Sequence, residues 1–184
     1  VYRERERQAI FVGAHLSNWE VMALGLGREG VPLLALHAPL QNPHLDALMD
    51  RARTQVDCGM LARGRSMRDR AGMSFSQVIS LMHQLRNGGS LGLLLDLAVK
   101  DGAPLSFFGQ PMRTSLTPAR LAERYGCDIV PVRTQRLGAA RFRLTVYPRL
   151  AFDANGIDEE ARAIAITRQL IAMMEQWIRE QPDE

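Results

Sequence analysis

Short apolar runs alternate with amphipathic segments along most of this chain. The strand-like runs cover residues 9–14, 31–37, 59–62, 91–95, 129–134 and 142–147. The helical segments cover 19–28, 42–56, 74–86 and 158–179, and another begins at Thr117-Pro118. Strands that alternate with helices predict an α/β fold, a single domain with a mostly parallel central sheet flanked by helices. The last two strand-like runs, joined by a turn that contains glycine, predict an antiparallel pair near the end.

The composition is that of a globular protein and excludes several classes. The 184 residues suffice for one domain with a sizeable core, and the formal net charge is +3. Lys100 is the only lysine among 23 basic residues. Aromatic residues make up 6% and do not interleave with basic runs, so nucleic acid is not expected as a partner. The isolated thiols of Cys58 and Cys127 fit a reducing compartment.

A histidine and a carboxylate follow the first apolar run. His15 comes at the end of the predicted strand, where open α/β sheets bind ligands, and Glu20 follows five positions later. A carboxylate near an imidazole fixes its tautomer and stabilises its protonated form, so the pair is suited to taking a proton from a hydroxyl. The same segment fits a capping box in which Ser17 caps the next helix and Glu20 reaches back to it. The two roles are compatible, and the sequence leaves both open.

Asp96 ends another apolar run, at 91–95. If the two strands are parallel, His15 and Asp96 lie on the same rim of the sheet. The alternative for Asp96 is a turn residue that bonds the local backbone. Further along, Phe107-Phe108-Gly109 is typical of core plus turn, or of the wall of an apolar tunnel.

Arginines cluster in the first half of the chain and suit a phosphorylated or anionic partner, although a solvated face is the simpler interpretation. They are Arg51, Arg53, Arg63, Arg65, Arg68 and Arg70. The histidines and cysteines have no metal-ligand spacing, so neither a metal nor another cofactor is expected.

The segment from His15 to Glu20 resembles the HxxNWE signature of the bacterial lipid A biosynthesis (lauroyl/myristoyl) acyltransferases, which are relatives of the glycerolipid acyltransferases. The resemblance continues in order through Asn42-Pro43 with Leu45-Asp46, Arg53, Arg63, residues 89–96, Phe107-Phe108-Gly109, residues 118–122 and Val130-Pro131-Val132. It covers nearly the whole chain, and it is therefore more specific than the short histidine motif alone.

The resemblance implies a glycerolipid acyltransferase-like fold and transfer of a fatty acyl chain from an acyl-carrier-protein thioester to a hydroxyl of a lipid A precursor. It implies that His15 is the general base and that Glu20 orients and stabilises its ring. Arg53 and Arg63 would hold phosphate of the acceptor. The resemblance assigns four residues to substrate binding: Asn18, Arg53, Arg63 and Asp96.

The chain departs from the family pattern at Leu97, where the family usually has glutamine. We expect residues 1–184 to form a single acyltransferase domain within a longer protein that has an N-terminal membrane anchor and a further C-terminal end. The expected location is the cytoplasmic face of the cell inner membrane, with an anionic membrane surface as a partner. Two alternatives remain: a related acyltransferase with a lysophospholipid or glycolipid acceptor, and a non-catalytic lipid- or carrier-binding module.

Overall fold

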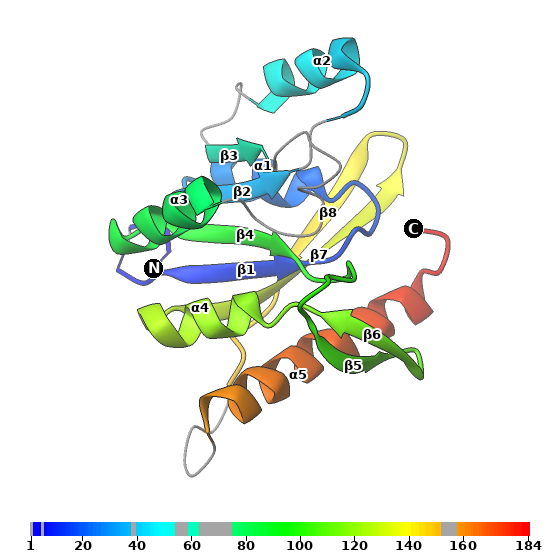
Figure 1. The fold of residues 1–184 in the computed structure, drawn as a ribbon. Coiled ribbons are helices and arrows are strands. Elements are labelled where there is room, and N and C mark those ends of the chain that lie inside the picture. The colour runs from blue at the N-terminus through cyan, green and yellow to red at the C-terminus, as the bar shows by residue number, and fades with distance from the viewer. Residues whose placement is uncertain (1, 5, 38–39, 54–58, 63–74, 152–157) are drawn as a thin grey trace.

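A six-stranded sheet is the centre of the fold (Figure 1). The computed structural model describes residues 2–4, 6–37, 40–53, 59–62, 75–151 and 158–184. The strand order is β3-β2-β4-β1-β7-β8, and all neighbours are parallel except the antiparallel pair β7 and β8. The predicted α/β class and mostly parallel sheet are therefore confirmed.

The elements follow the predicted alternation closely. The strands of the main sheet are β1 (Ala9–Gly13), β2 (Leu33–His37), β3 (Gly59–Ala62), β4 (Ser90–Leu94), β7 (Asp128–Gly138) and β8 (Arg141–Val146). The helices are α1 (Glu20–Arg28), α2 (Pro43–Arg53), α3 (Phe75–Arg86), α4 (Thr117–Tyr125) and α5 (Glu159–Glu180). The predicted end of the second helix, at 54–56, lies outside the described residues.

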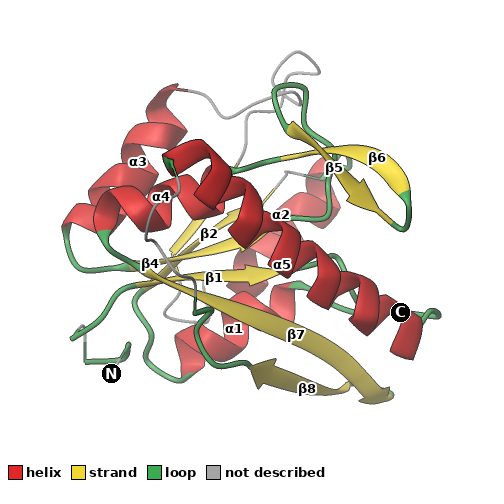
Figure 2. Cartoon of the chain, turned by 90° about the horizontal axis from the view of Figure 1, so that it is seen from below, coloured by secondary structure: helices red, strands yellow, loops and turns green. Residues whose placement is uncertain are grey.

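Strand β1 is buried on both faces, and its side chains divide between two apolar clusters. Ile10 and Val12 belong to the cluster under α3, α4 and α5, and Ala9 and Phe11 belong to the cluster under α1. Figure 2 shows α1 on the opposite face of the sheet from α4 and α5. Because successive side chains of a strand point to opposite faces, a continuous apolar run is what such a central strand requires.

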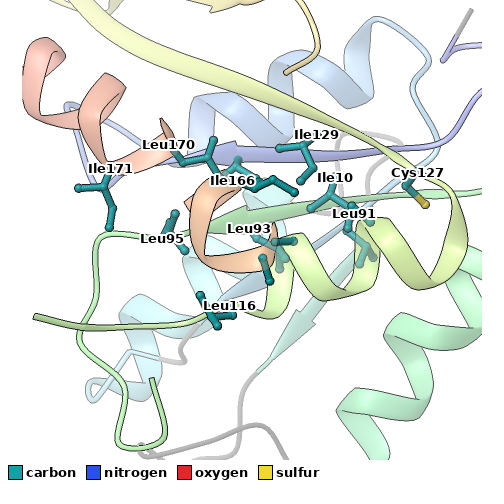
Figure 3. Close-up of a cluster of buried hydrophobic side chains, with 14 of the residues drawn as sticks. Ile10, Leu91, Leu93, Leu95, Leu116, Cys127, Ile129, Ile166, Leu170 and Ile171 are labelled. Carbon is teal, nitrogen blue, oxygen red and sulfur yellow. The ribbon is translucent and has the colours of Figure 1, made fainter. Parts of the chain in front are cut away.

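The larger cluster holds α5 against the sheet. Ile166, Leu170 and Ile171 of α5 lie among core residues of the central strands (Figure 3). Asp158 begins the helix, and its side chain accepts the N–H of Ala161 at 2.8 Å. The predicted long final helix is confirmed, and its cap satisfies one of the N–H groups that every helix start leaves open.

A small antiparallel hairpin was not predicted. It consists of β5 (Ala103–Phe107) and β6 (Gln110–Thr114), which pair only with each other. Phe108 and Gly109 form its two-residue turn, with φ of 49° and 76°. Positive φ at both positions is the signature of a type I′ hairpin turn. Proline within each of these short strands hid the hairpin from a pattern-based prediction.

Within the described part of the chain, we find no helix with the length and apolar character needed to cross a bilayer.

Candidate active site

His15 and Asp96 are in direct contact at the carboxyl edge of the sheet. Nδ1 of His15 lies 2.8 Å from Oδ1 of Asp96, and the His15 backbone N–H donates to Oδ2 at 2.8 Å. The pairing of β1 with β4 explains this contact, because Gly13 is in register with Leu94. His15 lies two residues after Gly13, and Asp96 lies two residues after Leu94. The prediction that both residues share one rim is confirmed.

The geometry determines which ring nitrogen of His15 is available. An ionised carboxylate can only accept hydrogen bonds, so in the neutral imidazole a bond to Asp96 assigns the proton to Nδ1 and the lone pair to Nε2. The His15 side chain is about one-third exposed, whereas the Asp96 side chain is mostly covered. The Trp19 ring approaches the imidazole edge-on, with 5.9 Å between the ring centroids. The ring is thus held through Nδ1 and partly exposed, with Nε2 as the nitrogen that is free to act as a base in this tautomer.

Glu20 bonds to Arg53. Oε1 of Glu20 lies 2.5 Å from Nη2 of Arg53, in the last turn of α2. We expected Glu20 to orient the imidazole, but the bond to Nδ1 comes from Asp96. In this structure, Glu20 instead joins the start of α1, just after the His15 loop, to α2.

The loop between His15 and Glu20 is not the capping box that the sequence suggested. Helix α1 begins at Glu20 itself, with Trp19 at the cap position and no side-chain cap bond. Ser17 has a φ of 55°, and its buried hydroxyl has no hydrogen-bond partner among the described residues. The side chain of Asn18 accepts the Glu20 N–H at 3.2 Å instead. The expectation that Ser17 caps the helix is therefore wrong, because Asn18 takes the local bond.

Arg53 is a buried member of an ion-pair network rather than a surface cation. Its side chain is only 4% exposed. Nη1 donates to Asp50 at 3.0 Å, and Nη2 donates to Glu20. Both terminal nitrogens of the guanidinium thus have carboxylate partners already. Arg63, the other arginine assigned to acceptor phosphate, lies outside the described residues, as do Arg65, Arg68 and Arg70.

Phe107 and Phe108 lie at the tip of the β5–β6 hairpin, and Phe108 contacts α5. Phe107 and Phe108 pack edge to face, with 5.0 Å between the ring centroids. The Phe108 N–H donates to Glu175 at 2.7 Å, and the Arg179 guanidinium lies 4.9 Å from the Phe108 ring centre. The pKa of Glu175 is lowered, first by the Phe108 N–H bond and then by Arg179. Phe107 ends β5 and packs against the larger core cluster, whereas Phe108 lies in the turn and is exposed, as the interpretation of core plus turn had it.

One hollow among the described residues lies away from His15. It has a volume of about 980 Å³ and is lined by residues such as Arg7, Arg124 and Asp128, at the edge where β1 and β7 begin. Cys127 also lines it, and burial raises the pKa of that thiol to about 11, with the Asp128 charge adding to the shift. A thiol with such a pKa is a poor nucleophile at neutral pH. The described residues contain no cluster of three or more potential metal ligands.

Sequence reasoning missed two contacts of the site. Glu20 and Arg53 are 33 positions apart, and nothing in the local pattern pairs them. The bond between Asp96 and Nδ1 of His15 could have been predicted, because the parallel sheet places both residues on the same rim. The choice between the two carboxylates depends on side-chain geometry, which spacing does not determine.

A protein-family model described as bacterial lipid A biosynthesis acyltransferase matches residues 2–184. Comparison with individual curated proteins gives no match. The family match includes every described helix and strand and all the residues of the candidate site.

Proposed function

Because the chain belongs to the bacterial lipid A biosynthesis acyltransferase family, we propose that it transfers a fatty acyl chain from a carrier-protein thioester to a hydroxyl of a lipid A precursor. The observation that carries this proposal is the bond between His15 and Asp96 at the carboxyl edge of the sheet. In the proposal, Nε2 of the partly exposed His15 ring accepts the hydroxyl proton.

The proposed reaction needs no covalent intermediate on the protein. Nε2 of His15 takes the proton as the acceptor oxygen attacks the thioester carbonyl. A tetrahedral oxyanion forms, the C–S bond then breaks, and the carrier thiolate takes the proton back from the imidazolium. Asp96 stabilises that imidazolium through Nδ1. General-base catalysis of this kind contributes roughly 10²–10⁴-fold in rate.

The start of α1 supplies the second requirement of acyl transfer, which is stabilisation of the oxyanion. The helix begins at Glu20, five residues after His15. The N–H groups of Glu20, Val21 and Met22 are already bonded to Asn18 and Trp19, so this end acts on a nearby charge through the helix dipole. A helix N-terminus carries about half a positive charge and favours an anion. In the proposal, this end of α1 faces the developing negative charge.

Glu20, Asn18 and Arg53 are assigned positioning roles. Asn18 holds the first turn of α1, and the bond of Glu20 with Arg53 ties that turn to α2. These contacts fix the His15 loop relative to the rim. Phosphate binding by Arg53 is the less favoured assignment, because both terminal nitrogens of the guanidinium are occupied. The phosphate role of Arg63 remains part of the proposal.

The donor and the location complete the proposal. An acyl carrier protein delivers the thioester, and the reaction takes place at the cytoplasmic face of the inner membrane, against an anionic lipid surface. The family assignment supports this location, because lipid A precursors are lipids.

Radiolabelled acyl transfer tests the proposal directly. His15→Ala should reduce transfer to a lipid A precursor by roughly 10²-fold or more, because it removes the base. His83→Ala is the matched control, since His83 is an exposed histidine on α3 and bonds only to Asn87 in the contacts that the structure gives. Retention of a tenth or more of the activity by His15→Ala would exclude His15 as the base.

A panel of acceptors separates the alternatives. Lysophospholipid and glycolipid acceptors, offered with the same donor, should be poor substrates. Faster transfer to either would reassign the acceptor. Tight binding of lipid or carrier protein without any transfer would favour the non-catalytic module.

A further inference from the structure

Helix α2 buries charged side chains and exposes leucines. Of the α2 side chains that the structure describes, only Asp46 and Arg53 are buried, and Met49 between them is half-buried. Leu45 and Leu48, one turn apart, are 52% and 60% exposed. An ordinary surface helix does the reverse, with its apolar stripe on the core.

The buried charges explain how α2 is held without its leucines. Arg53 bonds to Glu20 of α1, and Asp46 accepts the Leu40 N–H at 2.9 Å. The Arg53 bond attaches α2 to the first turn after the His15 loop. The helix is thus fixed beside the candidate active site by polar contacts, while its leucines remain available.

The exposed residues around the leucines are His44, Arg51, the apolar Ala47 and the acidic Asp50, whose carboxylate is bonded to Arg53. His44 and Arg51 are exposed, each within one turn of a leucine, and Leu40 just before the helix is exposed as well. A helix that places exposed leucines beside an arginine is suited to the boundary between acyl chains and phosphate headgroups. There the leucines enter the apolar layer, while an arginine reaches back to phosphate.

We propose that the face of α2 formed by Leu45 and Leu48, with Leu40 beside it, inserts into the interface of an anionic lipid bilayer and places the His15 site against the membrane. This inference deepens the proposed function and rests on it, because a lipid acceptor must be reached at a membrane surface. Arg51 provides the charge complementarity to the headgroups, and the leucines provide the apolar contact.

A second copy of the chain fits this face less well. A stable protein interface buries about 800 Å² on each partner. Two exposed leucines on a short helix, with a third just before it, provide only a small part of such an area. Insertion into a bilayer has no such size threshold, because each buried methylene contributes independently.

Vesicle sedimentation with a matched pair of double variants tests the inference. Leu45→Gln with Leu48→Gln should weaken binding to vesicles of phosphatidylethanolamine and phosphatidylglycerol by roughly ten- to thirtyfold. The control is Ile79→Gln with Leu137→Gln, because these side chains are 49% and 47% exposed on other elements. The control should bind like the unmodified protein. Equal weakening by both pairs would overturn the assignment to α2.

Salt and stability provide two further readouts. The ratio between unmodified and α2-variant binding should persist at about 1 M salt, where exposed charges are screened beyond about 3 Å. A ratio that disappears at high salt would contradict leucine insertion. The melting temperature of the α2 variant should stay close to that of the unmodified protein. A large fall in the melting temperature of the α2 variant, with unchanged vesicle binding, would show that the leucines pack against the chain itself. A change in the oligomeric state of the variant would assign the leucine face of α2 to a second copy of the chain.

Activity in two formats separates this inference from the proposed function. The α2 variant should transfer acyl chains normally to an acceptor dispersed in detergent and poorly to an acceptor embedded in vesicles. His15→Ala should fail in both formats. Vesicle binding is measured without turnover, so absence of transfer in every format would reject the proposed function and leave the binding result to decide the role of α2.

Discussion

The Asp96 carboxylate holds His15 at two points, with one oxygen on the ring Nδ1 and the other on the backbone N–H, each at 2.8 Å. The first bond sets the tautomer, and the second fixes the first residues of the loop that leaves β1. A single side chain therefore controls both the chemistry and the position of the proposed base. Asp96 can do so because it leaves the neighbouring strand at the equivalent position.

Asp96→Asn should lower acyl transfer by roughly 10²–10⁴-fold while the protein stays folded. The asparagine keeps the shape but removes the charge that stabilises the imidazolium, and its amide can present a donor to Nδ1. The measurement is kcat/KM for the acceptor together with the melting temperature. Asp101→Asn is the control, because Asp101 is an exposed turn residue five positions further on. Activity of Asp96→Asn within threefold of the control would remove Asp96 from the mechanism.

The sequence predicts those parts of the site whose positions are set by the strands of the sheet. The apolar runs that end at His15 and Asp96 located both residues, because parallel strands finish on one edge. The partner of Glu20 could not be predicted, since Arg53 reaches it from another helix across a long stretch of chain. The start of α1 was predicted to within one residue, but its capping was not, because Ser17 and Glu20 fit a capping box in sequence while the backbone at Ser17 adopts positive φ.

Glu20→Gln should reduce stability as well as activity, because it leaves the buried guanidinium of Arg53 without one of its two carboxylates. Removing one partner of a buried pair costs about 3 kcal/mol. That loss corresponds to a fall of roughly 6–12 °C in melting temperature for a domain of this size. Thermal unfolding measures the fall in melting temperature. Activity is then measured well below the melting temperature of the variant, where the protein is folded. An unchanged melting temperature together with a loss of activity would favour the direct catalytic role that the sequence suggested for Glu20.

Arg53→Lys distinguishes structure from phosphate binding. Lysine keeps the charge but has no planar fork with which to bridge Glu20 and Asp50. We expect a lower melting temperature and similar changes in KM for acceptor and carrier-protein donor. An acceptor KM that rises alone, at unchanged stability, would restore the phosphate role.

Cys127 should react slowly with alkylating reagents in the folded protein. Its pKa is raised from 9.0 to about 11, mainly by burial, so the thiolate is about 100-fold scarcer at pH 8 than for an ordinary thiol. The rate should rise about tenfold per pH unit between about pH 7 and 9.5, without a plateau. Peptide-resolved mass spectrometry after iodoacetamide pulses separates Cys127 from Cys58, and urea-unfolded protein is the control. A plateau near pH 9 would contradict the raised pKa.

The contact of Glu175 with Phe108 should weaken in acid. The Phe108 N–H and Arg179 both stabilise the ionised carboxylate, and so the folded protein holds the Glu175 pKa below its ordinary value. A lowered folded pKa means that the stabilisation is complete above the ordinary glutamate range and is lost as the pH falls through the folded pKa. The β5–β6 turn should therefore open more readily in acid. Amide exchange at Phe108, corrected for the intrinsic rate, measures the opening.

The comparison needs a variant in which Glu175 is never charged. At neutral pH, Glu175→Gln should exchange faster at Phe108 than the unmodified protein, and the two should converge as the pH falls, because protonation removes the same charge. Glu159→Gln serves as the control, since it removes one exposed carboxylate from the first turn of the same helix. It should leave exchange at Phe108 unchanged at every pH. If both variants accelerate exchange equally, the effect comes from the overall charge of α5, and the specific bond between Glu175 and Phe108 does not hold the hairpin.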